Sequence, residues 1–532
     1  MRLYSIAFLL LSFLSGGSSV AGELSKEVQN KLVERMEALQ IEGKIPGLSV
    51  TTFTNEGIQF SKALGRRSLG DSKGVHSKST MFPLSSVSKL FTTLSVFQLI
   101  DKGEFDLSTP LSKLVKSHFH KIISSQCSEK MSHLKSITVG HLLSHQAGIS
   151  QDLTGANLWW DASALNDGAY PSHQTFDENF CQTDFIFEAG NVPTGMKYSN
   201  LGFNLLGQIV AAYGGHQSLE GYVGSEILTP LKMKNTRYSM TRQTADSFLA
   251  TAYGNPGSLL GGSSDDRTAL PMVLDPQSYA GSIGVNSSSE DLALLGNEML
   301  AWINQESARF PNLAQHWRKI LQPKSHNLPQ LSWANGFMLF NTKSSDFKFH
   351  NNGTLCFGHT GTNYGSRAIL YVCPQLNWGF SAVFNARNAN RERFMLEVSQ
   401  ILADHNVLKY SESLSKEVSD WMMEVAQFQE QTIVSPPPKV NLLEPKDYPE
   451  NLKDYAGKYH SDTTGAEMIG VSENNKLVMW GRELLPVSED LFRFPAVTDP
   501  YSSGEPVQFI RDKNGRVVKI LAAHVLNAPK IQ

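Results

Sequence analysis

The sequence predicts an α+β protein in which an antiparallel sheet is flanked by helices, with an all-α subdomain and a small C-terminal β-barrel-like domain. Strand-like runs occur near both ends of the first 405 residues, and a long stretch of helical patterns separates them. A proline-rich segment then precedes a further set of short strand-like runs. Elements segregated in this way are typical of α+β folds, and 532 residues are too many for one ordinary core.

The first residues have the pattern of a signal peptide. "MRLYSIAFLLLSFLSGGSSVAGE" contains one arginine, an apolar run from Ile6 to Leu14, and Ser19 and Ala21 placed as at a signal-peptidase site. We expect residues 1–21 to be removed on export, which makes the mature protein periplasmic or secreted. The alternative is an uncleaved anchor, but the run is short for about 30 Å of hydrocarbon. No comparable run follows, so no transmembrane span is expected in the mature chain.

Residues 22–430 are predicted to form the larger domain around a sheet in two parts. Apolar residues at helical spacing predict a helix over 24–40, and "LSVTTF" and "IQFSKAL" predict two strands around the turn Asn55-Glu56-Gly57. Helical patterns dominate from Ser85 to about residue 300. Four further strands and a helix are predicted at 336–340, 354–361, 366–373, 379–384 and 391–403. We expect the two sets of strands to join into one antiparallel sheet with a helical insertion.

A linker and a small β domain are predicted after residue 430. Ser435-Pro436-Pro437-Pro438 forbids helix and marks residues 431–440 as a short, stiff linker. Residues 441–532 contain short strand-like runs, with an Asn514-Gly515 hairpin turn between the last two. Because the linker is short, we expect the small domain to dock on the larger one.

Charge and cysteine content limit the partners. The net charge is −3, from 47 basic and 50 acidic residues, so no nucleic-acid footprint is present and a small-molecule or peptide substrate is expected. No C-x-x-C motif or histidine cluster indicates a metal, and no cofactor is expected. The oligomeric state is not indicated. Cys356 and Cys373 flank a predicted hairpin turn, and the sequence allows either a disulfide between them or two free thiols. Cys127 and Cys181 have no predicted pairing.

"FPLSSVSKLFTTL", residues 82–94, places a serine at the start of a predicted helix and a lysine one turn later. Apolar spacing and a following glycine predict this helix over 86–102. Lys89 then projects from the same face as Ser86. A desolvated lysine can help remove the proton of a serine, and the helix N-terminus supplies N–H groups for an oxyanion. The alternative is an N-cap serine with a solvated lysine, and the same spacing recurs at Ser132/Lys135, Ser345/Lys348 and Ser413/Lys416.

Two further motifs accompany this one. Tyr198-Ser199-Asn200 stands directly before an amphipathic helix, and His359-Thr360-Gly361 ends a strand-like run. A serine-x-x-lysine helix, a tyrosine-x-asparagine element and a basic-Thr-Gly strand are the three parts of serine β-lactamases and penicillin-binding proteins. Over roughly residues 25–405 the chain resembles the β-lactamase-related serine hydrolases of the class C type, which implies a β-lactamase/transpeptidase-like fold. Residues 441–532 are similar to the small lipocalin-like domain appended to many such enzymes.

The resemblance implies a role for each motif residue. Ser86 would be acylated by a carbonyl substrate, and Lys89 would lie between Ser86 and Tyr198, the general base or proton shuttle. The backbone N–H groups of Ser86 and Thr362 would form the oxyanion hole. The residues expected to bind substrate or stabilise the oxyanion are Asn200, His359, Thr360, Gly361 and Thr362. The appended domain would either shape the active-site mouth or serve packing alone.

The chain departs from the class C pattern at the third motif. His359 stands where class C β-lactamases usually carry lysine, and a neutral imidazole binds a substrate carboxylate less strongly, which argues against an efficient class C β-lactamase. Arg367 either supplies the missing charge or is an ordinary surface arginine. Tyr253-Gly254-Asn255 fits the same short pattern as the tyrosine motif, but it lies among loop residues, so Tyr198 is preferred.

The resulting prediction is an exported serine hydrolase that works through an acyl-enzyme. Its expected substrates are peptides with D-residues, including peptidoglycan-derived ones, or small esters and amides, so it would act as a carboxypeptidase, aminopeptidase or esterase. Two alternatives stay open: a catalytically quiet penicillin-binding or muropeptide-sensing protein, and a class C-like β-lactamase. The shared apparatus of the family does not rank peptide against ester.

Overall fold

The computed structural model describes residues 24–531 with internal gaps. The gaps are 71, 129–130, 153–168, 171, 182, 184, 193–194, 255–267, 271, 304–308, 329–330, 342–353, 364, 411–413, 431–446, 462–464, 473, 496–503 and 523–525. The predicted signal peptide 1–21 and the predicted linker 431–440 lie outside the described residues. Within the described ranges, no helix combines the length and apolar character needed to cross a membrane.

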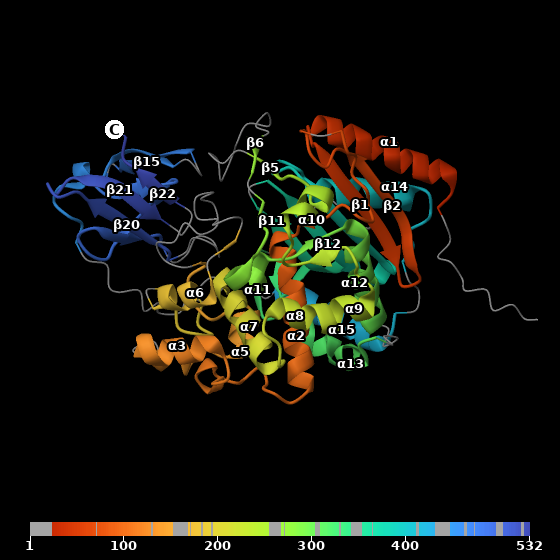
Figure 1. The fold of residues 1–532 in the computed structure, drawn as a ribbon, viewed down its shortest axis with the longest axis horizontal. Coiled ribbons are helices and arrows are strands. Elements are labelled where there is room, and N and C mark those ends of the chain that lie inside the picture. The colour runs from red at the N-terminus through yellow and green to blue at the C-terminus, as the bar shows by residue number, and fades with distance from the viewer. Residues whose placement is uncertain are drawn as a thin grey trace, which may run out of the picture.

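An eight-stranded antiparallel sheet forms the centre of the larger domain (Figure 1). Its strand order is β2-β1-β13-β12-β11-β10-β9-β8. The strands are β1 (Gly47–Thr54), β2 (Gly57–Gly65), β8 (Ser325–Leu328), β9 (Leu331–Trp333), β10 (Met338–Asn341), β11 (Leu355–Thr362), β12 (Arg367–Cys373) and β13 (Trp378–Phe384). The N-terminal hairpin pairs with β13, so the predicted sheet in two parts is confirmed. β8 and β9 were not predicted, because strands of four and three residues are too short to show an alternating pattern.

Helices cover both faces of this sheet. Along β13, Phe380 and Phe384 belong to one apolar core and Val383 to the other, because successive side chains point to opposite faces. The first core is covered by α1 (Lys26–Glu42) and α14 (Arg391–Asp404), which pack against each other. The second core is covered by α2 (Ser88–Asp101) and α12 (Ser289–Ile303). α2 is buried nearly throughout, and its position in the centre of the molecule fixes the start of the helix in space.

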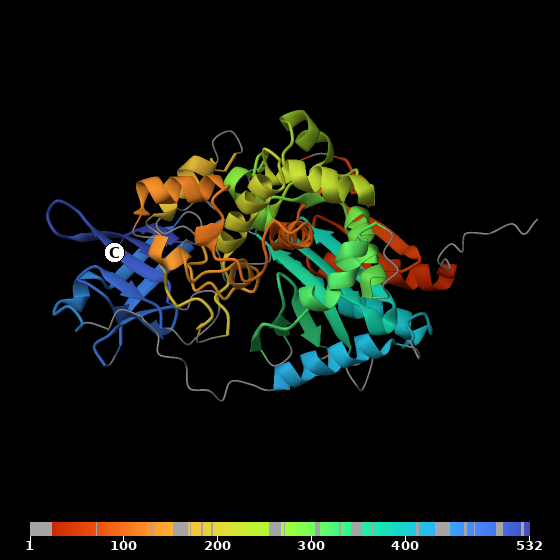
Figure 2. The ribbon, with the colours of Figure 1, turned by 90° about the horizontal axis from the view of Figure 1, so that it is seen from below.

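The helical insertion and the end of the domain supply the remaining elements. Its helices are α3 (His118–Gln126), α4 (Met131–Leu134), α5 (Val139–Leu143), α6 (His173–Phe180), α7 (Asn200–Tyr213), α8 (Leu219–Val223), α9 (Thr229–Leu231), α10 (Arg242–Phe248), α11 (Ala280–Ile283) and α13 (Pro311–Ile320). Five two-residue strands are β3 (Phe82–Pro83), β4 (Thr236–Arg237), β5 (Tyr253–Gly254), β6 (Thr268–Ala269) and β7 (Asn286–Ser287). α15 (Lys416–Glu430) runs along the lower side of the molecule in Figure 2. It docks through Trp421, whose ring packs edge-to-face on that of Trp317 in α13.

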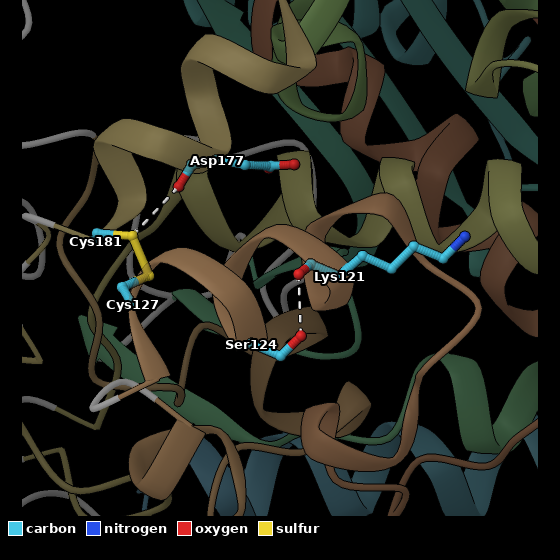
Figure 3. Close-up of a disulfide and its surroundings, with 5 residues drawn as sticks. All are labelled: Lys121, Ser124, Cys127, Asp177 and Cys181. Atoms are coloured by element: carbon cyan, nitrogen blue, oxygen red, sulfur yellow. Dashed lines mark hydrogen bonds between the residues drawn. A yellow bond between two sulfur atoms is a disulfide. The ribbon is translucent and has the colours of Figure 1, made fainter.

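All four cysteines form disulfides. Cys356 and Cys373 face each other across β11 and β12 and are bonded, which resolves the alternative that the sequence left open. Figure 3 shows the second disulfide, between Cys127 at the end of α3 and Cys181 at the end of α6. The Cys181 sulfur also lies 3.9 Å from the Asp177 carbonyl one turn earlier. The disulfide thereby links α3 to α6 through two cysteines that are 54 residues apart in sequence.

The C-terminal domain is an antiparallel β structure with its own core. It has a four-stranded sheet, β14-β15-β16-β17, and a five-stranded sheet, β18-β19-β20-β21-β22. An isolated bridge from Tyr459 to Lys530 links them, but in the described ranges no closed barrel forms, so the expectation of a barrel-like domain is corrected to two sheets. The closing edge is short, because β17 and β18 have two residues each. The strands are β14 (Gly457–Ser461), β15 (Gly465–Val471), β16 (Leu477–Met479), β17 (Arg482–Glu483), β18 (Leu485–Pro486), β19 (Leu491–Arg493), β20 (Pro506–Arg511), β21 (Val517–Ala522) and β22 (Leu526–Pro529).

The small domain lies beside the helical insertion in both views, at the end of the molecule remote from α1 (Figures 1 and 2). A buried ion pair between Lys197 and Glu505 joins the two domains. The predicted Asn514-Gly515 turn connects β20 to β21, and Gly515 has a φ of 77°, a conformation that favours glycine.

Candidate active site

Ser86 lies in a single turn of 3-10 helix, Ser85–Val87, which leads directly into α2. The predicted helix therefore begins two residues later than expected. The preceding Ser85 has a φ of 49°, a left-handed conformation that is uncommon outside glycine and frequent at functional sites. The Ser88 hydroxyl accepts a hydrogen bond from the Val285 N–H at 3.0 Å and anchors the turn. Ser86 is thus held, half-buried, at the N-terminus of a buried helix.

Lys89 is buried beside Ser86 and donates three hydrogen bonds. Its Nζ lies 3.2 Å from Ser86 Oγ, 2.7 Å from Asn200 Oδ1 and 3.1 Å from the Ser282 carbonyl oxygen. Burial lowers the pKa of Lys89 to about 7, and the negative charge of Asp152 opposes this shift. A large fraction of Lys89 is therefore neutral near pH 7, and a neutral amine can accept a proton. The alternative of a solvated lysine is excluded, since the residue has 0% exposure.

The tyrosine motif brings two more side chains to the same point. The Tyr198 hydroxyl donates a hydrogen bond to Ser86 Oγ at 2.8 Å, and its ring centroid lies 4.9 Å from Lys89 Nζ. Ser199 is the N-cap of α7, where its hydroxyl accepts from the Gly202 N–H, and Asn200 is the first helical residue. The motif spacing thus fixes Tyr198 just outside the helix and Asn200 just inside it.

A buried carboxylate completes this network. Asp152 Oδ2 accepts a hydrogen bond from Asn200 Nδ2 at 3.1 Å, while Asn200 Oδ1 accepts from Lys89. Asp152 is 4% exposed, so its charge acts on Lys89 through little water. The sequence reasoning missed Asp152, because a single aspartate in a polar loop has no distinguishing pattern.

His359 is present at the site as a neutral ring. Its Nδ1 lies 2.6 Å from the Thr360 carbonyl oxygen, so Nδ1 carries the proton and Nε2 is the acceptor. Nε2 is buried and has no hydrogen-bond partner in the described part of the chain. Burial, and then the charge of Lys89, lower the pKa of His359 to about 3. His359 therefore contributes an acceptor atom and no positive charge at neutral pH.

The strand that carries the third motif passes close to the nucleophile turn. A Cβ atom added to Gly361 would lie 2.0 Å from the Leu84 carbonyl oxygen, so only glycine permits this approach. Thr362, the proposed oxyanion donor, ends β11 next to it. The Arg391 Nη1 atom donates to the Gly361 carbonyl at 2.8 Å and to Thr362 Oγ1 at 2.7 Å. Arg391 thus places a positive charge at the third motif, which the neutral His359 does not. Sequence reasoning missed Arg391, because it stands at the start of a helix 30 residues after Gly361.

Arg367, the other candidate for this charge, bonds within its own turn. Its Nη1 donates to the carbonyl oxygens of Asn363 at 2.9 Å and Ser366 at 3.2 Å. Burial lowers its pKa to about 9. Neither of the two interpretations of Arg367 is therefore met, since the side chain is partly buried and its guanidinium supports the turn that follows β11.

A sequence model of the Beta-lactamase family matches residues 28–404. The chain belongs to the beta-lactamase family. Protein flp of Staphylococcus aureus (strain MW2) is 24% identical over 392 residues, which cover 72% of this chain and 68% of that protein. Putative beta-lactamase-like 1 of Homo sapiens is 22% identical over 233 residues, which cover 43% of each protein.

Two solved structures are similar in fold along nearly the whole chain. The crystal structure of SurE has a TM-score of 0.55 and 18% identity, and the match covers 95% of this chain and 99% of that one. The crystal structure of SurE with D-Leu has a TM-score of 0.51 and 18% identity, with 95% and 100% covered. Because this coverage exceeds the family match, the similarity of fold extends into the C-terminal domain.

His145 is a further residue of this beta-lactamase-family site that sequence reasoning did not assign. Its ring packs on the Tyr198 ring, with centroids 4.4 Å apart, and on Trp333 at 5.3 Å. Its Nδ1 accepts the Ser199 N–H at 3.1 Å, so the proton of the neutral ring lies on Nε2. Burial holds the pKa of His145 well below its usual range. His145 is therefore an uncharged ring that packs against the Tyr198 ring and holds it in place.

The competing tyrosine motif lies elsewhere. The Tyr253 hydroxyl accepts a hydrogen bond from the Leu69 N–H at 2.6 Å and lies 3.2 Å from Ser68 Oγ. Its partners therefore lie in the loop that follows β2. Asn255 of that motif is outside the described residues. Where the structure describes the chain, no group of three or more histidine, cysteine or carboxylate residues is arranged to hold a metal ion.

Proposed function

We propose that this protein is an exported serine hydrolase that forms an acyl-enzyme at Ser86, with D-amino-acid-containing peptides or small esters and amides as substrates. The observation that carries the proposal is the placement of two proton-transfer groups on one hydroxyl. Ser86 Oγ lies 3.2 Å from Lys89 Nζ and 2.8 Å from the Tyr198 hydroxyl. Such distances are those required of a nucleophile and its bases.

Acylation follows from these contacts. When Lys89 is neutral, its lone pair takes the Ser86 proton while Oγ bonds to the substrate carbonyl carbon and the carbonyl π electrons move to oxygen. The N–H groups of Ser86 and Thr362 are the proposed donors to that oxyanion. When the tetrahedral intermediate collapses, the bond to the leaving amine or alkoxide breaks. The leaving group takes the Tyr198 proton, and the proton held by Lys89 restores the phenol.

Deacylation repeats the sequence with water in place of the leaving group. The neutral Lys89 takes a proton from water as the water oxygen bonds to the acyl carbon, and when the intermediate collapses the bond to Ser86 Oγ breaks. Ser86 Oγ takes the Tyr198 proton, and the proton held by Lys89 restores the phenol. The hydrogen bond that Asn200 Nδ2 donates to Asp152 orients the Asn200 side chain, so that its oxygen accepts a hydrogen bond from Lys89 and holds the amine in place between catalytic cycles.

Three observations support the finer parts of the proposal. Two disulfides are typical of oxidising compartments, which supports export. The neutral His359 supports a peptidase or esterase over a class C-like β-lactamase. The similar structure of SurE with D-Leu supports the inclusion of D-residue peptides among the substrates to test.

Whole-protein mass spectrometry tests the proposal. The mature protein is exposed separately to an ester-bearing fluorophosphonate, a penicillin and a D-Ala-D-Ala peptide, and the modified residue is mapped. We expect a covalent adduct at Ser86 with the fluorophosphonate, no adduct in Ser86→Ala, and an unchanged adduct in Ser132→Ala, which has the same Ser-x-x-Lys spacing. An adduct at another serine, or none with any probe, would favour the quiet binding protein. Rapid turnover of penicillin would favour the β-lactamase.

A further inference from the structure

Glu505 of the C-terminal domain inserts its side chain into the larger domain. Its Oε1 lies 2.6 Å from Lys197 Nζ, and the two side chains are 1% and 0% exposed. The same oxygen accepts a hydrogen bond from the Gln151 N–H at 2.9 Å. A carboxylate buried this deeply persists only with partners of this kind, so the contact is a built feature of the domain interface.

The C-terminal domain holds Glu505 rigidly at the start of β20. The Phe494 N–H donates to the Glu505 carbonyl at 3.0 Å, and the Gly504 N–H donates to the Phe494 carbonyl at 3.2 Å. Arg493 Nη1 donates to the Gly504 carbonyl at 2.9 Å. Gly504 has a φ of 72°, and a Cβ atom there would lie 2.2 Å from Ile186 Cγ2 in the larger domain. The backbone on either side of the carboxylate is therefore seated tightly.

The two groups that Glu505 contacts belong to the segments that carry the site. Lys197 precedes Tyr198, and Gln151 precedes Asp152. These segments are bonded to each other, since the Asn200 N–H donates to the Gln151 carbonyl at 2.9 Å. Glu505 thus bridges the segment of the tyrosine and the segment of the buried carboxylate from outside the larger domain.

We propose that Glu505 is a positioning residue for Tyr198, so that the C-terminal domain completes the active site in addition to packing on it; this rests on the hydrolase function proposed above. When the carboxylate becomes a neutral amide, the attraction that holds the Lys197 ammonium weakens and the Gln151 N–H is left with an uncharged, weaker acceptor. Tyr198 then shifts relative to Ser86 Oγ, from which it is separated by 2.8 Å. A displacement of about 1 Å at a reacting group lowers a rate by about 10²-fold.

The test compares two identical substitutions in the C-terminal domain of the full chain. Glu505→Gln removes the buried charge. Glu483→Gln removes an exposed charge, whose pair with Lys476 spans 2.8 Å with both side chains about 40% exposed. Fluorophosphonate labelling of Ser86 is followed at several probe concentrations, which separates the maximal rate from the concentration dependence. We expect Glu505→Gln to lower the maximal rate about 10- to 100-fold with little change in the concentration dependence, and Glu483→Gln to match the wild type.

A double variant keeps the proposal testable if Glu505→Gln alone does not fold. Glu505→Gln combined with Lys197→Gln removes both charges and restores a neutral interface, and it is expected to label no faster than Lys197→Gln alone. A lowered melting temperature with an unchanged maximal rate would assign Glu505 a purely structural role. Equal losses in Glu505→Gln and Glu483→Gln, or full activity in the double variant, would likewise overturn the proposal.

Amide hydrogen exchange separates this inference from the proposed function. If the wild type takes no label at Ser86, the hydrolase proposal fails, while the positioning claim is still measured by exchange at residues 145–151 and 197–201. Faster exchange there in Glu505→Gln than in Glu483→Gln supports positioning by the C-terminal domain. Equal exchange contradicts it.

Discussion

At the scale of single residues, the property that sets the chemistry is the burial of Lys89. An ammonium group in a dry site is unfavourable unless its surroundings compensate for lost water, and the three oxygens and Asp152 do so only in part. The amine is therefore poised between its two protonation states near neutral pH. A serine beside a solvated lysine would have no comparable base, because an ordinary lysine is protonated until pH is well above 9.

The rate of Ser86 acylation should depend on pH through Lys89. The reactive form is the neutral amine, and the pKa is lowered from 10.5 to about 7. We expect the rate of labelling by the fluorophosphonate to fall about tenfold per pH unit below pH 7 and to level off above it. Lys89→Arg should remove both the activity and this pH limb, because a guanidinium does not lose its proton. A wild-type profile that is flat from pH 5 to 8 would contradict the role of Lys89.

Tyr198→Phe should lower the acylation rate by about 10²–10⁴-fold, the usual contribution of a positioned acid or base. The substitution removes the hydroxyl that donates to Ser86 Oγ and keeps the ring that packs on His145. Tyr253→Phe is the matched control, since its hydroxyl serves Ser68 and Leu69, and it should leave the rate unchanged. If the two effects were exchanged, the wrong tyrosine would have been assigned.

At the scale of elements, the site depends on how closely β11 lies to the turn that carries Ser86. Neither element contains a complete site: the Ser85–Val87 turn and α2 carry the proposed nucleophile Ser86 and the proposed base Lys89, and β11 carries the third motif and the proposed oxyanion donor. Arg391, at the first residue of α14, bonds to the last two residues of β11 and holds this end of the strand. The distance between the strand and the turn is therefore set by a glycine on one side and an arginine on the other.

Gly361→Ala should separate these two elements. The added Cβ would lie 2.0 Å from the Leu84 carbonyl oxygen, and backbone cannot move aside as a flexible side chain can. We expect the acylation rate to fall at least 10-fold, because Thr362 is displaced from the oxyanion. Gly470→Ala in β15 is the control, since nothing lies within 4 Å of a Cβ there. If Gly361→Ala were labelled by the fluorophosphonate at the wild-type rate, β11 would not contribute to the oxyanion hole.

At the scale of the whole molecule, two domains with separate cores share one site. The residues of the C-terminal core come only from that domain, and the two cores of the larger domain contain none of them. Each domain therefore has what it needs to fold, while the Lys197–Glu505 pair couples them at the segment of Tyr198. If Glu505 positions Tyr198 as proposed, the Tyr198 segment should be more ordered in the whole chain than in the larger domain alone.

A chain stopped before Ser435 should fold and lose much of its reactivity. Its two cores are intact, so we expect a cooperative unfolding transition by circular dichroism. Lys197 becomes accessible to water once Glu505 is absent, and labelling of Ser86 should slow by at least about 10-fold. The control is the full chain cut by a protease within residues 431–440, in which the docked domain keeps its contacts and the rate should persist. Equal rates in the stopped and full chains would limit the C-terminal domain to other roles.

The sequence by itself determined the local parts of this protein. Local patterns within about a dozen neighbouring residues predict Ser86 and Lys89 at the start of a helix, Tyr198 and Asn200 around a helix N-cap, and the sheet strands other than β8 and β9, because helix and strand periodicity are local properties. These patterns were sufficient for the fold class, the family and the catalytic candidates.

Only the tertiary structure decided which distant residues meet. Asp152, Arg391 and Glu505 reach the site from separate segments, and no local pattern distinguishes them from other charged residues. The pKa values of Lys89 and His359 were equally beyond the sequence, because they depend on how completely packing removes water from each side chain. That the barrel-like C-terminal domain consists of two sheets was beyond the sequence for a similar reason, since pairing between edge strands depends on residues that lie far apart in the chain.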